Sequence, residues 1–262
     1  MVSLYFVAFF VLGITIGSFL NVVIYRFNTK KSLGGRSICL SCQNKLSWYE
    51  LIPLFSFLGL KGRCRNCKTK ISIQYFLVEF ITGLIFAFLF LKFQDIFFTN
   101  ISIFGITYDY YAIMFSLLLV IAVYDLRHKI IPDMLSFIFG VLAFIGLFFF
   151  LDSSFYPHLP SVLGFFSGIL VALPFALLWL ISGGKWMGLG DAKLVLGIGW
   201  LLGLVGALSG LVIAVWSGAV IGILLVIFFK HYGMKSEIPF APSLIFGAFV
   251  AFIFNLNLFI FL

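Results

Sequence analysis

Two aspartates stand beside very apolar runs, one in "DLRHKIIPD", which begins at Asp125, and one in "GLGD", which ends at Asp191. Two carboxylates that face each other cannot both ionise cheaply, so such a pair shares one proton. A pair of this kind can activate a water molecule and protonate a leaving group. That is the chemistry of the aspartic proteases, which needs neither a metal nor a cofactor.

Each acid also has a structural interpretation. Asp191 could cap a helix, where the N-terminal dipole favours negative charge, and Asp133 is expected to act as such a cap. Asp125 ends an apolar run, where the dipole disfavours an acid, although Arg127 or Lys129 could neutralise it. A proton relay in a transporter is a further alternative, because acids within membrane segments also mark relays.

All four cysteines lie in one stretch, as "CLSC" (Cys39 and Cys42) and "CRNC" (Cys64 and Cys67). Two C-x-x-C pairs about twenty residues apart predict a tetrahedral zinc site, in which each pair forms a tight knuckle. Disulfides or free thiols are the alternatives, but a cytosolic loop is reducing. Four thiolates leave no open position for water, so the predicted zinc is structural.

The composition predicts an all-α polytopic membrane protein. The chain is 63% hydrophobic and 10% charged, with 36 Phe among 262 residues, and its mean hydropathy is +1.20. No soluble domain of this size buries so much apolar surface. The net charge of +8 could suggest nucleic acid, but the basic residues gather in one loop, where membrane topology explains them better. No nucleic-acid partner is therefore expected; the lipid bilayer is.

About eight transmembrane helices are predicted, and the first is a retained span rather than a signal peptide. Ten of the 17 Lys and Arg lie between Arg26 and Lys70, so this loop is expected to be cytosolic. Both termini are then outside. The expected spans are residues 2–25, 75–91, 108–124, 134–151, 161–182, 194–207, 208–229 and 240–261.

The lysines on either side of the apolar stretch from Leu194 to Phe229 predict that it contains two spans. Lys185, Lys230 and Lys235 are expected to lie inside, so two spans must separate Lys185 from Lys230. The Gly-rich "WLLGLVGALSG" provides the turn. The segments 93–107 and 152–160, with Asp95 and Asp152 and no Lys or Arg, are expected outside.

Three domains follow from this topology. Residues 1–25 are the first transmembrane helix, residues 26–74 a cytosolic zinc-binding loop domain, and residues 75–262 a transmembrane domain that carries the candidate aspartyl peptidase pair. No internal repeat is apparent in the sequence.

Five segments in order carry a family resemblance. They are "GSFLNVVIYR", the two-knuckle loop, "WYELIPLFSFLGLKGRCRNCKTKISIQYFLVEF", "YDLRHKIIPD" and "GLGDAKL". Together they resemble the type IV prepilin peptidase family, the aspartyl proteases of the bacterial inner membrane that serve type IV pilus assembly and type II secretion. The resemblance implies that Asp125 and Asp191 are the catalytic pair. Their substrate would be a prepilin or pseudopilin, whose leader is cut at the cytosolic membrane face.

The resemblance also implies a second activity. Family members with the four-cysteine loop are generally bifunctional and N-methylate the new N-terminus with S-adenosylmethionine. By resemblance, the residues for that cofactor are sought at Glu50, Gly62 and Arg63. The chain has no G-x-G-x-x-G nucleotide fingerprint, so no Rossmann domain is expected.

Two other functions compete with this one. The first is a proton-coupled transporter with a zinc-binding regulatory loop, and the second is a non-enzymatic assembly subunit that holds pilin. A transporter would leave a prepilin peptide intact, so a cleavage assay separates the three.

Overall fold

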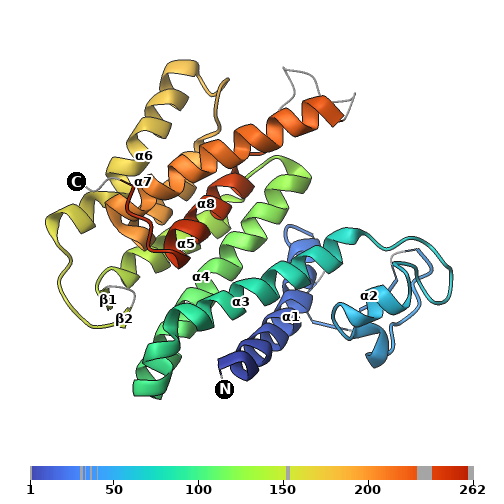
Figure 1. Cartoon of the computed structure of the whole chain (residues 1–262). Coiled ribbons are helices and arrows are strands. Elements are labelled where there is room, and N and C mark those ends of the chain that lie inside the picture. Colours follow the sequence, from blue (N-terminus) through green and yellow to red (C-terminus); the bar gives the residue numbers. More distant parts are fainter. Residues whose placement is uncertain are drawn as a thin grey trace. The chain divides into compact units, whose positions relative to one another are not determined.

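The computed structural model describes residues 2–29, 32, 34–35, 37–39, 41–151, 154–228 and 238–258. The described chain is mostly helical, as its apolar composition predicts. Its elements in order are α1 (Val2–Arg26), η1 (Trp48–Leu51), α2 (Phe55–Gly59), α3 (Ile73–Thr99), α4 (Ile101–His128), α5 (Asp133–Gly146), β1 (Phe150–Leu151), β2 (Ser154–Phe155), α6 (Val162–Ser182), α7 (Leu189–Phe228) and α8 (Ala241–Ile253) (Figure 1).

Five of the described helices, α1, α3, α4, α6 and α7, are long and apolar enough to cross a membrane. This confirms the prediction of an all-α polytopic membrane protein. The apolar helices α5 and α8 have 14 and 13 residues. At 1.5 Å per residue they are roughly 20 Å long, shorter than a hydrocarbon core of about 30 Å.

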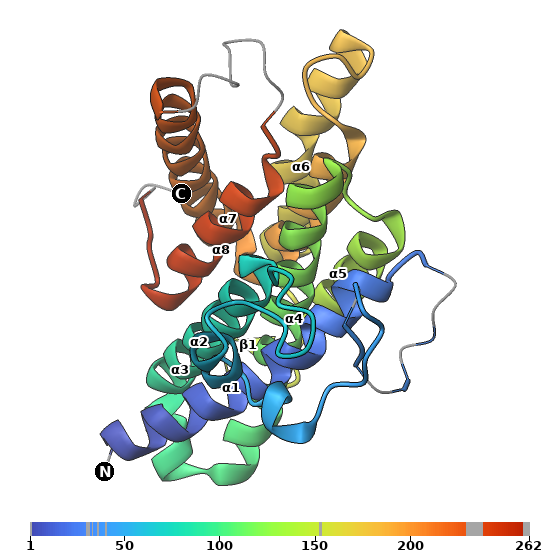
Figure 2. The same ribbon diagram turned by 90° about the vertical axis from the view of Figure 1, so that its right-hand side faces the viewer.

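The chain forms two compact units, Met1–Phe98 and Thr99–Leu262. In the first unit α1 and α3 run alongside each other in both Figure 1 and Figure 2. The side-chain amide of Asn21 on α1 donates a 3.0 Å hydrogen bond to the carbonyl of Tyr75 on α3. The Tyr75 ring also stacks on Tyr25, with ring centroids 4.7 Å apart. The three-domain division by function stays a prediction.

In the second unit α7 is the central element. It packs against α5, α6 and α8, and α4 packs against α5 and α8. Large side chains from four of these helices fill the interior, among them Phe115, Phe139, Leu194 and Leu244. Since α4 and α7 share the neighbours α5 and α8, the end of α4 and the start of α7 belong to one packed helical cluster.

The helix α7 is divided within the predicted Gly-rich turn. Gly203 has φ 70° and ψ 174°, which breaks a 40-residue segment into two helical arms. A conformation with positive φ suits glycine, which lacks a Cβ. The predicted division therefore occurs as a kink at one residue instead of a loop. Lys230, Lys235 and Asp152, on which the topology also relied, lie outside the described residues.

Two predicted spans were too long at their C-terminal ends. The span predicted at 134–151 stops at Gly146, and residues 150–155 form a short antiparallel hairpin in which Phe150 pairs with Phe155. The Phe150 ring stacks on Tyr110 of α4, with centroids 4.1 Å apart. Packing of the Phe150 ring against α4 thus favours the hairpin over a longer α5. The span predicted at 240–261 becomes α8, which ends at Ile253.

Candidate active site and metal centre

Asp125 lies in the last turn of α4, which ends where Lys129 adopts φ 53°. Only 5% of the residue is exposed. The backbone N–H of Ala241, the first residue of α8, lies near enough to the Asp125 carboxylate to stabilise the negative charge. The first N–H groups of a helix have no partner within it and carry the positive end of its dipole. The start of α8 therefore offsets the unfavourable position of this acid at the end of α4.

Neutralisation of Asp125 by a neighbouring cation is not observed. Within the described ranges its carboxylate forms no salt bridge, neither with Arg127 nor with Lys129. Burial of a charged carboxylate is expensive, and in the described part of the chain the N–H of Ala241, not a cation, stands beside this one.

Asp191 lies in the first turn of α7. The backbone N–H groups of Gly188 and of Asp191 itself lie near its carboxylate and stabilise the negative charge. This position agrees with the structural interpretation of the sequence, in which the N-terminal dipole of the helix favours an acid. The same carboxylate also experiences the charge of Asp125. The fold therefore brings two acids that are far apart in sequence within electrostatic reach.

The two aspartate motifs meet at Gly190. A Cβ added at Gly190 would lie 2.9 Å from the Cβ of Ile131, in the connection between α4 and α5. At Gly188 an added Cβ would make only ordinary contacts, at 3.7 Å with the Asp191 carboxylate and at 3.9 Å with the backbone nitrogen of Gly190. The absence of a side chain at Gly190 therefore lets the start of α7 approach the segment that follows Asp125.

Asp133 differs from these two acids. Its side chain is 77% exposed and forms a 2.6 Å salt bridge with Lys193 on α7. It is the first residue of α5, whose N-cap is Pro132, and no side chain caps that helix. Its charge suits the helix dipole, as expected, but its hydrogen bond goes to Lys193 instead of the backbone. An exposed pair of this kind adds little stability.

The four cysteines gather at one point. The sulfurs of Cys39, Cys42, Cys64 and Cys67 all lie within 4.8 Å of one another. A tetrahedron with Zn–S bonds of about 2.3 Å requires sulfurs about 3.8 Å apart. The Sγ atoms of Cys39 and Cys67 are 3.8 Å apart. The arrangement fits a four-thiolate zinc site, and no other ligand set is needed.

The two knuckles form a local structural repeat, which the sequence analysis missed. In each knuckle, the backbone N–H of the first cysteine donates a hydrogen bond to the carbonyl of the residue five positions later. The carbonyl of the same cysteine accepts a hydrogen bond from the N–H of the residue four positions later. The four hydrogen bonds are Cys39 N–H to Asn44 O, Gln43 N–H to Cys39 O, Cys64 N–H to Thr69 O and Lys68 N–H to Cys64 O. Gln43 and Lys68, the residues directly after the second cysteine of each knuckle, have φ 55° and 57°. The signal was the similarity of "SICLSCQNK" to "GRCRNCKTK".

Hydrogen bonds prepare two of these sulfurs to bind a metal as thiolates. The hydroxyl of Thr69 lies 3.1 Å from the Cys67 sulfur, and with the Thr69 backbone N–H it lowers the pKa of Cys67 to about 6. The backbone N–H groups of Cys42 and Ser41 lower the pKa of Cys39. The thiolate is the form of cysteine that binds metal, so both knuckles are suited to ligation.

Comparisons with known proteins cover both sites. Residues 11–93 match the Bacterial Peptidase A24 N-terminal domain, and residues 112–223 match the Type IV leader peptidase family. A "Prepilin leader peptidase/N-methyltransferase" of Xanthomonas campestris is 33% identical over 280 residues, covering 94% of this chain and 90% of the relative. The chain belongs to the Type IV leader peptidase family.

Two further relatives support the same family assignment. Proteins with the same description from Myxococcus xanthus and Vibrio cholerae are 36% and 32% identical. The matches cover 89% and 76% of this chain, and 67% and 78% of the relatives. No solved structure matches. The N-terminal family match contains the four cysteines, and the second match contains Asp125 and Asp191.

The residues expected to hold the family's methyl donor lie in the first unit. Glu50 belongs to η1, and its carboxylate accepts a 2.7 Å hydrogen bond from the backbone N–H of Ser47. Gly62 has φ 64°, and an added Cβ would lie 3.0 Å from Phe57. Arg63 lines a pocket of about 360 Å³. The structure thus gives Glu50 and Gly62 local structural roles and places Arg63 alone on a cavity.

Proposed function

We propose that Asp125 and Asp191 form the catalytic pair of an endopeptidase that removes the leader from type IV prepilins or pseudopilins. One observation carries the proposal. The fold brings these two acids, from separate motifs at the end of α4 and the start of α7, within electrostatic reach. The family match and the relatives described as prepilin leader peptidases support the same substrate class.

The reaction uses the pair in opposite protonation states. One carboxylate accepts a proton from water as the water oxygen attacks the scissile carbonyl carbon. The other, protonated, carboxyl hydrogen-bonds to the carbonyl oxygen, and a proton then passes to the departing amine as the C–N bond breaks. The N–H groups of Ala241 and Gly188 stabilise the charged form of the two side chains during this exchange. Because the acids share one proton, we assign the roles to the pair and not to either residue alone.

We place the site at the cytosolic face of the inner membrane. The ten cations between Arg26 and Lys70 put the cysteine loop inside, and Asp125 and Asp191 then lie near the same surface. A prepilin has a short basic leader followed by a long apolar helix. That helix can lie in the bilayer while the leader stays in the cytosol. The scissile bond is then at the depth of the two acids.

The zinc-binding role of the cysteine loop is structural in this proposal. Residues 26–74 offer little core of their own, and a four-thiolate zinc supplies folding energy to small domains. Cys39, Cys42, Cys64 and Cys67 would hold it. With four protein ligands the ion has no open position, so it takes no part in cleavage.

The second activity is N-methylation of the amine that cleavage releases, as the names of the relatives imply. S-adenosylmethionine is the methyl donor implied by the family resemblance. The pocket at Arg63 does not fit that molecule. It is lined by Lys61, Arg63, Arg65 and Lys68 and by no acid, and four cations repel a sulfonium ion. No step is therefore assigned to residues of this pocket.

Substitution of the acids tests the peptidase proposal. Asp125→Asn and Asp191→Asn should each abolish cleavage of a prepilin by the purified protein in detergent, because an amide cannot relay the proton. Asp133→Asn is the matched control. It removes an exposed acid of the same surface and should leave substantial activity. A dead Asp133→Asn enzyme beside a normally active Asp125→Asn enzyme would refute the assignment, and an intact peptide with wild-type protein would point to the transporter instead.

A further inference from the structure

The short helix α2 leaves an apolar face uncovered in the cysteine loop. Phe55 and Leu58, three residues apart and therefore on one side of the helix, are 70% and 61% exposed. Trp48, in the neighbouring element η1, is 77% exposed. We call Trp48, Phe55 and Leu58 the apolar face. All three lie outside the helices that could span a membrane, so lipid tails around a transmembrane helix do not explain them.

The opposite side of α2 fixes it beside the start of α3. The Phe57 ring contacts Phe76 of α3, with centroids 5.6 Å apart. The backbone N–H of Leu54, just before α2, donates a 2.8 Å hydrogen bond to the buried carboxylate of Glu79. Glu79 is the seventh residue of α3. Six residues of helix rise span roughly 9 Å, so α2 lies beside the first two turns of α3.

A tight turn holds this attachment in one conformation. Leu54 has φ 60° and ψ −50°, and Phe55 N–H donates a 2.7 Å hydrogen bond to Pro53 O across it. These values describe a γ-turn, which is a strained conformation for a residue with a branched side chain. The strain persists because Glu79 binds the Leu54 N–H. The depth of α2 along α3 is therefore set by a defined contact.

That depth corresponds to the membrane interface. The 27 residues of α3 extend roughly 40 Å, the thickness of a bilayer with its headgroups. The first two turns of α3 then lie among the headgroups and at the edge of the hydrocarbon. Trp and other aromatic side chains are enriched at this level. The apolar face is thus positioned where lipid is the surrounding solvent.

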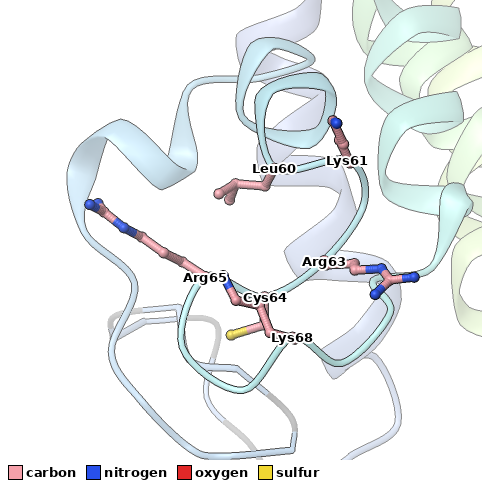
Figure 3. Close-up of a pocket in the computed structure, with 6 residues that line it drawn as sticks. All are labelled: Leu60, Lys61, Arg63, Cys64, Arg65 and Lys68. Carbon is pink, nitrogen blue, oxygen red and sulfur yellow. The ribbon is translucent and has the colours of Figure 1, made fainter.

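Cations follow the apolar face in the sequence. Lys61, Arg63, Arg65 and Lys68 line the adjacent pocket, and Glu50 is the only acid between residues 26 and 74. Figure 3 shows Lys61, Arg63 and Arg65 pointing away from one another. Arg65 also donates a hydrogen bond of 2.6 Å to Tyr49. Side chains that diverge do not enclose one small anion, but they can reach several headgroups of an anionic surface.

We propose that η1 and α2 form an interfacial anchor, in which Trp48, Phe55 and Leu58 enter the bilayer and the cations that follow them contact anionic lipid headgroups. The anchor would hold the cysteine loop against the membrane surface. An apolar segment flanked by Lys and Arg binds such a surface by apolar burial together with electrostatic attraction.

Trp48 fluorescence tests the anchor in the full-length, zinc-loaded protein. The protein is placed in nanodiscs of phosphatidylcholine brominated near the headgroup, with or without phosphatidylglycerol, and the signal of the Trp48→Phe variant is subtracted. Trp48 emission should fall at least twofold in brominated lipid, and iodide should quench it severalfold less than in detergent. The anionic lipid should increase the bromine quenching.

Matched variants locate the effect. Phe55→Gln with Leu58→Gln should abolish the bromine quenching, whereas Leu159→Gln, also highly exposed but in the other unit, should not. Lys61→Asn with Lys68→Asn should remove the effect of phosphatidylglycerol, because Asn tolerates the positive φ at both positions. Lys129→Asn, with a similar φ, is the control.

Two results would overturn the proposal. Full quenching by iodide without quenching by bromine would place Trp48 in water. Blue-shifted emission without bromine quenching would mean that protein, such as a second copy of the chain, covers the face. Phe55→Trp in the Trp48→Phe background provides an independent reporter without adding a polar group, so misfolding of the Gln variants cannot decide the outcome.

Discussion

Gly190 offers the sharpest test of how the two aspartates are positioned. Gly190→Ala places a methyl group 2.9 Å from the Cβ of Ile131, whereas ordinary contact begins near 3.4 Å. The start of α7 must then move by about 0.5 Å from the segment after Asp125. Overpacking of this kind costs about 1–3 kcal/mol of stability.

The activity loss follows from the same displacement. Asp191 is the next residue and moves with the helix. Because a misplacement of 1 Å can cost about 100-fold in rate, half of that displacement predicts a loss of about tenfold in kcat. KM should change little, since no contact to substrate is removed. Gly140→Ala, in α5, is the matched control and should stay within about threefold of wild type, because its added methyl group meets nothing within 4 Å.

A double-mutant cycle separates packing from other roles of Gly190. In an Ile131→Gly background the clashing Cβ is gone, so Gly190→Ala should have almost no further effect. In an Ile131→Ala background the Cβ remains, and the tenfold loss should persist. Steady-state cleavage of a synthetic prepilin, followed by mass spectrometry, provides the assay. An equal loss from Gly190→Ala in all three backgrounds would refute the packing explanation and favour direct approach of the substrate backbone to Gly190.

Three further predictions concern metal, order and topology. Elemental analysis should find one zinc per chain, and Cys→Ser changes of both cysteines in either knuckle should lower methylation more than cleavage; equal loss of both activities from a well-folded protein would contradict this. The Asp125→Asn variant should give no methylated product from a full precursor but should methylate pilin that is already cut. The reason is that the acceptor α-amine, with a pKa of about 7.7–8.0, arises only on cleavage. Absence of a methyl label on pre-cut pilin treated with the folded variant would refute this separation of the two activities. A phosphatase that folds only outside the cytosol should be active when fused at residue 159 and inactive at residue 45, and the reverse pattern would invert the proposed topology.

The sequence was sufficient to locate the apolar segments in order, but not all of their ends. Hydropathy placed both ends of α1 and α6 within one residue, because long apolar runs with charged flanks have few other conformations in a membrane. It ended α3 eight residues early and began α4 seven residues late, so the predicted external segment 93–107 is helical except at Asn100. It could not show that α5 stops at Gly146, since "LFFFL" is as apolar as a helix interior. The stacking of Phe150 on Tyr110 depends on a residue forty positions earlier, and no local pattern contains it.

The acids of the candidate site could be recognised in the sequence by their charge, but the contacts that position them could not. Asp125 and Asp191 stood out because acids beside apolar runs need a reason, and topology placed them near one surface. The partner of Asp125 did not stand out. Ala241 contributes a backbone N–H, which carries no signature in the side-chain sequence. The pairing of Gly190 with Ile131 was likewise invisible, although both residues belong to the motifs that were recognised.

The start of α8 has a role at the candidate site. An acid at the end of α4 faces the negative end of that helix's dipole and would be unfavourable there alone. The N-terminus of α8 brings unpaired N–H groups and positive potential to Asp125, so the two helix ends compensate each other. This contact requires a helix that begins beside Asp125, and hydropathy placed that beginning within one residue, at position 240. The prediction differed at the other end, where α8 stops at Ile253, and that end takes no part in the contact with Asp125.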